Sequence, residues 1–190
     1  MIRYRSDICP PWPLYEHICQ GASVLDVGCG MGAQLITLAA LGRISSGYGV
    51  DVSSKAVAQA ALAAKYYPQS NLTFQVMDSI DDVPQKQFDV AMMIDVMHHI
   101  PLEHRNATFA GCIKRVKPCG LFIYKDMADE PSLNAFVNRL HDLVIAREIV
   151  EYLPLEAALE WAANFDLQLI LRSQYTKLFY RHELLVFRKP

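Results

Sequence analysis

Several features that would assign this chain to a broad class are absent. No apolar run approaches the roughly 18 residues needed to cross a bilayer, so no membrane span is predicted. The net charge is only −2, which provides no basic field for nucleic acid. The first residues, MIRYRSDICPPWP, lack the apolar segment of a signal peptide. The five cysteines include no C-x-x-C pair and are odd in number, which favours reduced thiols in a cytoplasmic protein.

What is present suits one domain with a substantial core, because 190 residues are 52% hydrophobic. Short apolar runs alternate with helical patterns along the first part of the chain. Strands are predicted at 23–27, 48–50, 72–76, 88–94 and 121–124. Helices are predicted at 33–41, at 53–67 with Ser53 as N-cap, and from Pro101 to about Val116. A turn is predicted at 117–120. This alternation is typical of a parallel sheet covered by helices on both faces.

The C-terminal part departs from the alternation. Apolar residues spaced three and four apart predict a helix over 132–150, and another is expected near 155–164. Segments 166–171 and 178–187 then follow each other as strands with no helix between them, so they should pair antiparallel. The sequence therefore predicts five parallel strands and a terminal antiparallel pair.

A glycine-rich loop, DVGCGMGA at 26–33, joins the first strand to the first helix. Its glycines at 28, 30 and 32 let the backbone approach a ligand closely and tolerate positive φ. The loop also fits the dinucleotide fingerprint. A nicotinamide-dependent oxidoreductase is therefore one interpretation, and a tight strand–helix turn without a ligand is another.

Three acidic residues at the ends of the first three strands favour a different ligand. Asp26 would repel a pyrophosphate and favour a ligand with an amine and a sulfonium. Asp51 ends the second strand, where a carboxylate can bind both hydroxyls of a ribose, and Asp78 follows the third, where it could accept from an adenine amino group. All three lie at the carboxyl ends of adjacent strands, where such sheets bind ligands.

The chain resembles the class I S-adenosylmethionine (SAM) dependent methyltransferase family over roughly residues 14–190. The resemblance rests on these segments taken in order: VLDVGCGMG, YGVDVS, FQVMDSI, FDVAMMIDVMHHIP, RVKPCGLFIYKD and the terminal strand pair. The resemblance implies an α/β fold with one Rossmann-like, doubly wound sheet of seven strands. Their order is 3-2-1-4-5-7-6, strand 7 is antiparallel, and helices cover both faces. It also implies an N-terminal lid or helix segment at 1–22, a methyltransferase domain at 23–190, and a helical insert at 131–160 that covers the acceptor pocket.

The same resemblance implies SAM as the cofactor and S-adenosylhomocysteine as the product. The first loop would hold the methionyl part, the end of the second strand the ribose and adenine, and the end of the third the adenine edge. The residues after the fourth strand would line the methyl-donor side. The implied cofactor-binding residues are Asp26, Gly28, Gly30, Asp51, Val52, Asp78, Ser79, Ile94 and Asp95.

Catalytic candidates follow the fourth and fifth strands. In IDVMHHIP (94–101), adjacent histidines on one short loop rarely converge on one ion, so no metal is predicted. His98 is either structural or a base or hydrogen-bond donor for the acceptor, whereas packing or helix-start hydrogen bonding is favoured for His99. Lys125 and Asp126 either pair with each other or contact the acceptor. The catalytic candidates are His98, Lys125 and Asp126.

The leading prediction is an enzyme that moves a methyl group from SAM to a small molecule by in-line displacement. The loop after the fourth strand reads DVMH and lacks an N-P-P-[YF] motif, the family's usual mark for base or amide nitrogen methylation. O- or C-methylation of an aromatic, polyketide-like or acyl compound is expected, with no nucleic-acid partner. The alternatives are a SAM-binding accessory protein without transfer activity and the oxidoreductase. The exposed edge of the C-terminal strands makes a homodimer possible.

Overall fold

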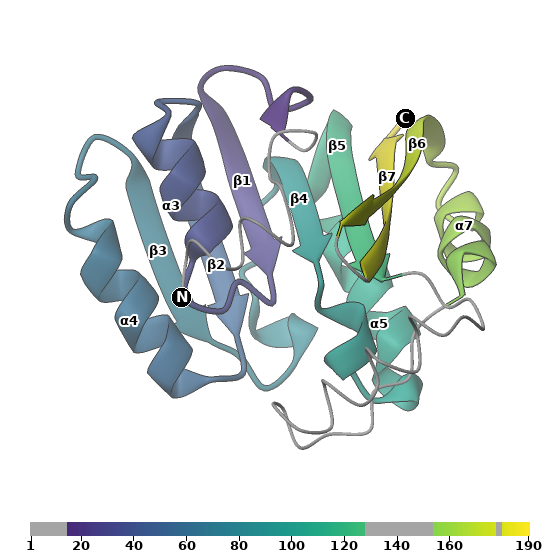
Figure 1. Ribbon diagram of the computed structural model, residues 1–190, viewed down its shortest axis with the longest axis horizontal. Helices are drawn as coiled ribbons and strands as arrows, with labels where there is room; N and C mark the ends of the chain where they lie inside the picture. Colours follow the sequence, from purple (N-terminus) through teal and green to yellow (C-terminus); the bar gives the residue numbers. More distant parts are fainter. Residues whose placement is uncertain (1–14, 128–153, 178–179) are drawn as a thin grey trace.

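The computed structural model describes residues 15–127, 154–177 and 180–190, which form a seven-stranded sheet in the order β3-β2-β1-β4-β5-β7-β6 (Figure 1). Strands β1 to β5 are parallel, and β7 is antiparallel to both β5 and β6. The predicted fold, strand order and antiparallel terminal pair are confirmed. The strands are β1 (Ala22–Val27), β2 (Ile44–Asp51), β3 (Asn71–Val76), β4 (Phe88–Ile94), β5 (Val116–Met127), β6 (Gln168–Lys177) and β7 (Tyr180–Arg188).

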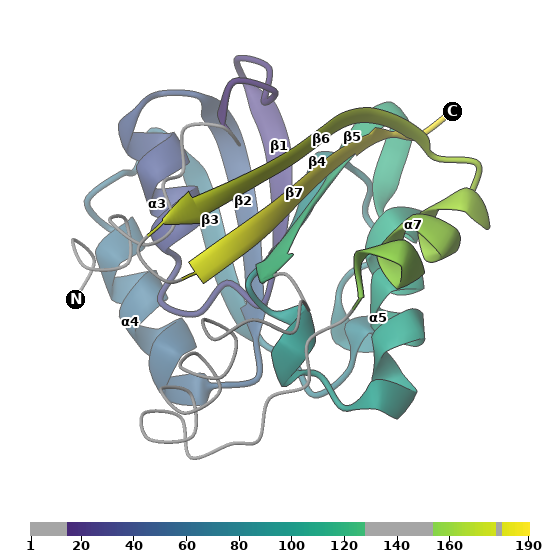
Figure 2. The same ribbon diagram turned by 45° about the vertical axis from the view of Figure 1, so that its right-hand side comes forward.

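Helices cover both faces of this sheet. Figure 2 shows α3 and α4 on one side and α5 and α7 on the other. The helices are α3 (Ala33–Ala40), α4 (Ser54–Ala64), α5 (Leu102–Lys114) and α7 (Leu155–Ala163), with short 3-10 turns η1 (Ile80–Asp82) and η2 (Met97–His99). Ser53 is the N-cap of α4 as predicted, because its hydroxyl accepts from the Ala56 N–H at 3.3 Å. No helix of the described residues is long and apolar enough to cross a membrane.

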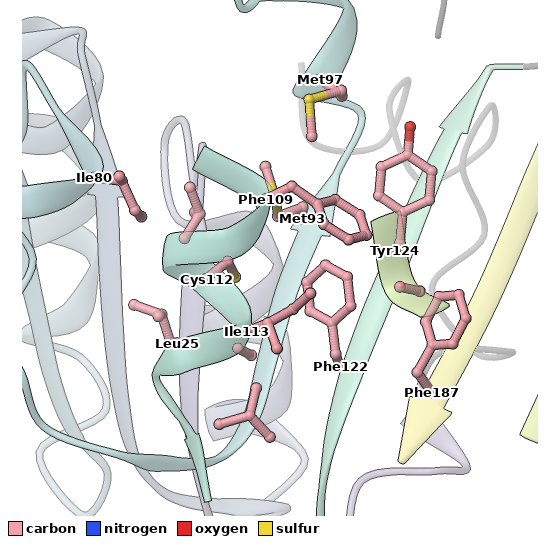
Figure 3. Packing of buried hydrophobic residues seen from close by; sticks show 14 of the residues in the cluster. Leu25, Ile80, Met93, Met97, Phe109, Cys112, Ile113, Phe122, Tyr124 and Phe187 are labelled. Carbon is pink, nitrogen blue, oxygen red and sulfur yellow. The ribbon is translucent and has the colours of Figure 1, made fainter. Parts of the chain in front are cut away.

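The core consists of two apolar clusters, one on each face. Under α5 and α7, Phe109 packs edge-on against Phe122 of β5, with ring centroids 5.0 Å apart (Figure 3). Under α3, Leu35 and Leu38 belong to the second cluster, together with Val24 of β1. Central strands buried on both faces explain why their sequences are continuous apolar runs.

The turn predicted at 117–120 is wrong, because β5 already begins at Val116. Pro118 and Gly120 suggest a turn, but these residues form an irregular stretch of the strand instead. The register shifts from Phe88 opposite Val116 to Val90 opposite Leu121, and Cys119 has a positive φ of 61°. Two backbone hydrogen bonds with Lys189 hold this stretch, from the Cys119 N–H at 3.1 Å and to the Gly120 carbonyl at 2.9 Å.

Other element boundaries moved as well, most of all for the strand predicted at 166–171, which is β6 at Gln168–Lys177. Strand β2 begins at Ile44 rather than 48, helix α4 ends at Ala64, and Pro101 is the N-cap of α5 rather than part of its first turn. Helix α7 matches the helix expected near 155–164. The helix predicted over 132–150 and most of the predicted 1–22 segment lie outside the described residues, so both stay predictions.

Candidate functional site

The glycine loop lies where β1, β2 and the loop after β4 meet. Gly28 has a φ of 78°, and a Cβ at this position would lie 2.1 Å from Cγ2 of Val96, so the loop after β4 packs too closely for a larger residue. Gly30, with a φ of 52°, donates its N–H to Oδ2 of Asp51 at 2.7 Å. These contacts join the first loop to the second strand and to the segment that carries the histidines.

Carboxylates give this edge of the sheet a negative character. Asp26 is buried at 1% exposure on β1, between Gly49 of β2 and Met92 of β4. Burial, followed by the charges of Asp26 and Asp51, raises the pKa of the Cys29 thiol far above its ordinary value. The thiol therefore stays protonated, and the field around the loop suits a cationic ligand.

Asp51 is the half-buried last residue of β2, and the exposed Val52 follows it. One Asp51 oxygen accepts from Gly30, and the other accepts from the Ser53 N–H at 2.9 Å, so the carboxylate has a fixed orientation. Val52 is 69% exposed and presents an apolar surface next to this carboxylate. A polar group beside an apolar side chain suits a ligand that has both sugar and base.

After β3, Asp78 and Ser79 are exposed, but their backbone is ordered by η1. Both residues donate their N–H groups to Oδ2 of Asp82 at 2.9 Å, and these bonds lower the pKa of Asp82. The Ser79 hydroxyl accepts from the Asp81 N–H at 3.3 Å, which makes Ser79 the N-cap of η1. Ser79 therefore has a local structural role in addition to its predicted position at the adenine edge.

The loop after β4 is fixed to β5 by its first residue. Asp95 follows the buried end of β4 at Ile94, has a φ of 52°, and donates its N–H to the Lys125 carbonyl at 2.8 Å. Its two carboxylate oxygens lie 2.5 and 2.6 Å from Nζ of Lys125, which is fully buried. Burial alone would raise the pKa of Asp95, but the charge and hydrogen bonds of Lys125 lower the pKa to about 2.

A second connection between the loop after β4 and strand β5 involves a histidine. His98 of η2 is 5% exposed, and its Nδ1 is hydrogen-bonded to Oδ1 of Asp126 at the end of β5. The same Oδ1 accepts the Met127 N–H at 2.8 Å. When Nδ1–H donates to the carboxylate, Nε2 is the ring nitrogen that can accept a proton. His99 is exposed, and its ring centroid lies 4.1 Å from that of His98.

One alternative left open by the sequence is therefore wrong: Lys125 and Asp126 do not pair with each other. Successive residues of a strand point to opposite faces, so the two side chains lie on different sides of β5. Lys125 pairs with Asp95 and Asp126 pairs with His98. Within the described ranges, no cluster of three or more His, Cys, Asp or Glu side chains could hold a metal ion.

Sequence reasoning missed the polar residues that β7 adds beside this pair. Glu183 lies opposite Asp126 in the β5–β7 register, and His182 lies opposite Met127. Both residues are buried, and Glu183 accepts from Nε2 of Gln174 on β6 at 2.5 Å. The signal was two ionisable residues directly before the buried run LLVF, but only the register shows which β5 residues they face.

We predict that the Asp95–Lys125 pair makes stability depend on acid pH. The folded pKa of Asp95, about 2, is below the unfolded value of about 3.9, so its contribution is present above pH 4 and is lost as the pH falls through 2. Asp95→Asn should lose about 2–3 kcal/mol of unfolding free energy at pH 7 and flatten this acid dependence. Urea unfolding between pH 7 and 2 measures both effects. The exposed Glu160→Gln serves as control, and an Asp95→Asn profile equal to that of the wild type would contradict the prediction.

A family model described as "Methyltransferase domain" matches residues 24–120. The chain is 32% identical to a ubiquinone biosynthesis O-methyltransferase of Albidiferax ferrireducens, over 61% of this chain and 46% of that protein. It is 26% identical to a phosphoethanolamine N-methyltransferase of Plasmodium falciparum, over 56% of this chain and 40% of that protein. The chain thus spans about half the length of the curated relatives it matches.

Two solved structures illustrate the likeness in fold. Magnesium protoporphyrin IX methyltransferase from Synechocystis, with bound S-adenosylhomocysteine, has a TM-score of 0.74 and 20% identity, covering 94% of this chain and 79% of that one. Geranyl diphosphate C-methyltransferase from Streptomyces coelicolor, in complex with Mg²⁺, geranyl diphosphate and S-adenosylhomocysteine, has a TM-score of 0.79 and 13% identity, covering 98% and 80%. At these identities the likeness concerns the fold alone.

Proposed function

Because the chain belongs to the methyltransferase-domain family, we propose that it transfers the methyl group of SAM to a hydroxyl group of a small-molecule acceptor. The predicted family is confirmed, and SAM is the cofactor of this family. The oxidoreductase interpretation rested only on the glycine loop, and it loses its support with the family assignment.

The residues at the carboxyl edge of the sheet fit this cofactor. The negative field of Asp26 and Asp51 suits a ligand that carries an ammonium and a sulfonium. Asp51 is oriented by two backbone donors and has lone pairs left for ribose hydroxyls, while Val52 offers an apolar face for adenine. Gly28 and Gly30, both with positive φ, shape the turn against which the methionyl part is proposed to lie. When bound, SAM supplies a methyl group activated by its positive sulfur.

The buried His98–Asp126 pair carries the proposal that oxygen is methylated. An acceptor hydroxyl must lose its proton as it attacks, and a histidine whose Nδ1 is held by a carboxylate presents Nε2 as the base. The proton moves from the acceptor oxygen to Nε2, and Asp126 stabilises the imidazolium that forms. Asp126 is thus a positioning residue. Lys125 does not contact the acceptor in this proposal; it holds Asp95, the first residue of the loop that carries His98.

Four further predictions belong with this proposal and depend on the whole protein. We expect the 131–160 region to cover the acceptor pocket and the 1–22 region to act as an N-terminal lid. We also expect a cytoplasmic location, with a homodimer formed through the terminal strands as one possible assembly. The relatives whose printed names specify O-methylation support oxygen as the target, although each matches this chain over only part of its length.

The test is transfer of label from methyl-labelled SAM in a lysate of the source cell. Purified protein is incubated with the lysate, and label is counted in small-molecule, lipid, protein and RNA fractions. Label in the small-molecule or lipid fraction, on a base-stable ether, supports the proposal. Label in protein or RNA overturns the acceptor class. No label, from protein that binds SAM in calorimetry, favours the accessory alternative. Asp51→Ala protein provides the matched blank.

A further inference from the structure

Two buried polar atoms beside the His98–Asp126 pair need an explanation. The Tyr124 hydroxyl and Oδ2 of Asp126 belong to residues that are each 2% exposed, and neither atom has a hydrogen-bond partner among the described residues. Buried polar groups are nearly always hydrogen-bonded, because an unsatisfied one keeps its full desolvation cost. Two such atoms next to a proposed catalytic pair indicate a site for a polar ligand group.

The two atoms belong to one face and one end of β5. Tyr124 and Asp126 are two residues apart in the strand, so their side chains lie on the same face. The Tyr124 ring packs edge-on against Phe109, with centroids 5.9 Å apart. Figure 3 shows its hydroxyl pointing away from Phe122, toward the side where Met97 of η2 lies. The hydroxyl is therefore directed to the end of β5 where Asp126 holds His98.

The chemistry of the two atoms restricts what can bind them. Burial, followed by the charge of Asp126, raises the pKa of Tyr124 well above its ordinary value, so the phenol keeps its proton. Oδ2 of Asp126 can only accept while the carboxylate is ionised. A hydroxyl group satisfies both atoms, because it accepts from Tyr124 and donates to Asp126. An ammonium would leave the phenolic proton unpaired, and a carboxylate would repel Asp126.

We propose that Tyr124 Oη and Asp126 Oδ2 bind one hydroxyl group between them, which makes Tyr124 a positioning residue for the His98–Asp126 pair. The inference rests on the proposed function for the role of His98. The hydroxyl comes either from an ordered water or from the acceptor itself. Charged or titratable groups on the elements packed around the pair are Asp95 and His99 after β4, Arg105 of α5, Lys125 of β5, and His182 and Glu183 of β7.

The test compares wild type with Tyr124→Phe, both saturated with S-adenosylhomocysteine. If a water is bound, the variant loses a satisfied hydrogen bond and its Tm falls by about 2–4 °C. The His98 titration, followed by ¹⁵N NMR, then moves to higher pH, because Asp126 has fewer donors and holds the imidazolium more strongly. Tyr66→Phe is the matched control, since that side chain is 83% exposed.

A second arm distinguishes the acceptor as the source. Phenol is added as a hydroxyl probe, and toluene serves as the same ring without the hydroxyl. If the acceptor supplies the group, the phenol of wild type is unsatisfied without it, so Tyr124→Phe is at least as stable as wild type alone, and only wild type gains Tm with phenol over toluene. The proposal is overturned if Tyr124→Phe is at least as stable as wild type, wild type gains no more Tm with phenol than with toluene, and the His98 titration is the same in both proteins. No readout uses methyl transfer, so this failure is distinct from that of the proposed function.

Discussion

Replacing His98 with asparagine is expected to lower kcat by about 10²–10⁴-fold, while the dissociation constant for SAM changes less than twofold. The Asn amide can still donate to Asp126, so the buried carboxylate keeps a partner, but no group remains that can take a proton from the acceptor. The loss should therefore appear in the chemical step and not in cofactor binding.

Steady-state kinetics on the acceptor identified by label transfer measures this effect, and calorimetry with S-adenosylhomocysteine measures binding. The acid side of the wild-type pH–rate profile should disappear in His98→Asn, which a purely structural role would not produce. His104→Ala is the matched control, because His104 is an exposed histidine at the start of α5. Wild-type turnover in His98→Asn would remove the histidine from the mechanism and favour its structural interpretation.

Replacing Asp51 with alanine is expected to weaken SAM binding by about 100-fold or more. A hydrogen bond to a charged group contributes about 1.5–3 kcal/mol, and the carboxylate is proposed to accept from both ribose hydroxyls. The substitution also removes the acceptor for the Gly30 and Ser53 N–H groups, so the glycine loop loses its connection to β2. Asp51→Asn should bind SAM with an affinity between those of wild type and Asp51→Ala, because the amide oxygen replaces only one of the two carboxylate acceptors.

Calorimetric titration with S-adenosylhomocysteine separates this role from catalysis. Glu160→Ala provides a control for loss of a carboxylate, since Glu160 is exposed on α7. A Tm measured without ligand shows how much of the effect arises from the loop itself. If Asp51→Ala binds the cofactor as wild type does, the carboxylate serves only to fix the glycine loop, and the ribose assignment is wrong.

The sequence was sufficient for the order of elements because the relevant signals are local. The glycines between a buried strand and a helix, the acids that end successive strands, and the missing crossover before the last strand each depend on a few neighbouring residues. The stretch at 117–120 shows the limit of such signals. Its proline and glycine predict a turn, but hydrogen bonds with Lys189, far along the chain, keep it within β5.

The charge pairs of the site show a second limit. Lys125 and Asp126 are neighbours in sequence, and only the alternation of β5 assigns them to different faces and hence to different partners. The position of Glu183 opposite Asp126 requires the register of an antiparallel pair, which the sequence does not specify. Long-range geometry therefore determined which of the predicted residues act together.

The two connections between the loop after β4 and the end of β5 have a consequence for substitutions elsewhere in the chain. Asp95–Lys125 and His98–Asp126 tie both ends of a short loop to one strand, on opposite faces of it. The proposed base and the first residue after β4 are thus held by side chains within 95–126. On the proposed function, changes in segments before and after this unit would leave the proton-transfer groups in place. On that basis we expect substitutions outside 95–126 to alter acceptor binding more than proton transfer.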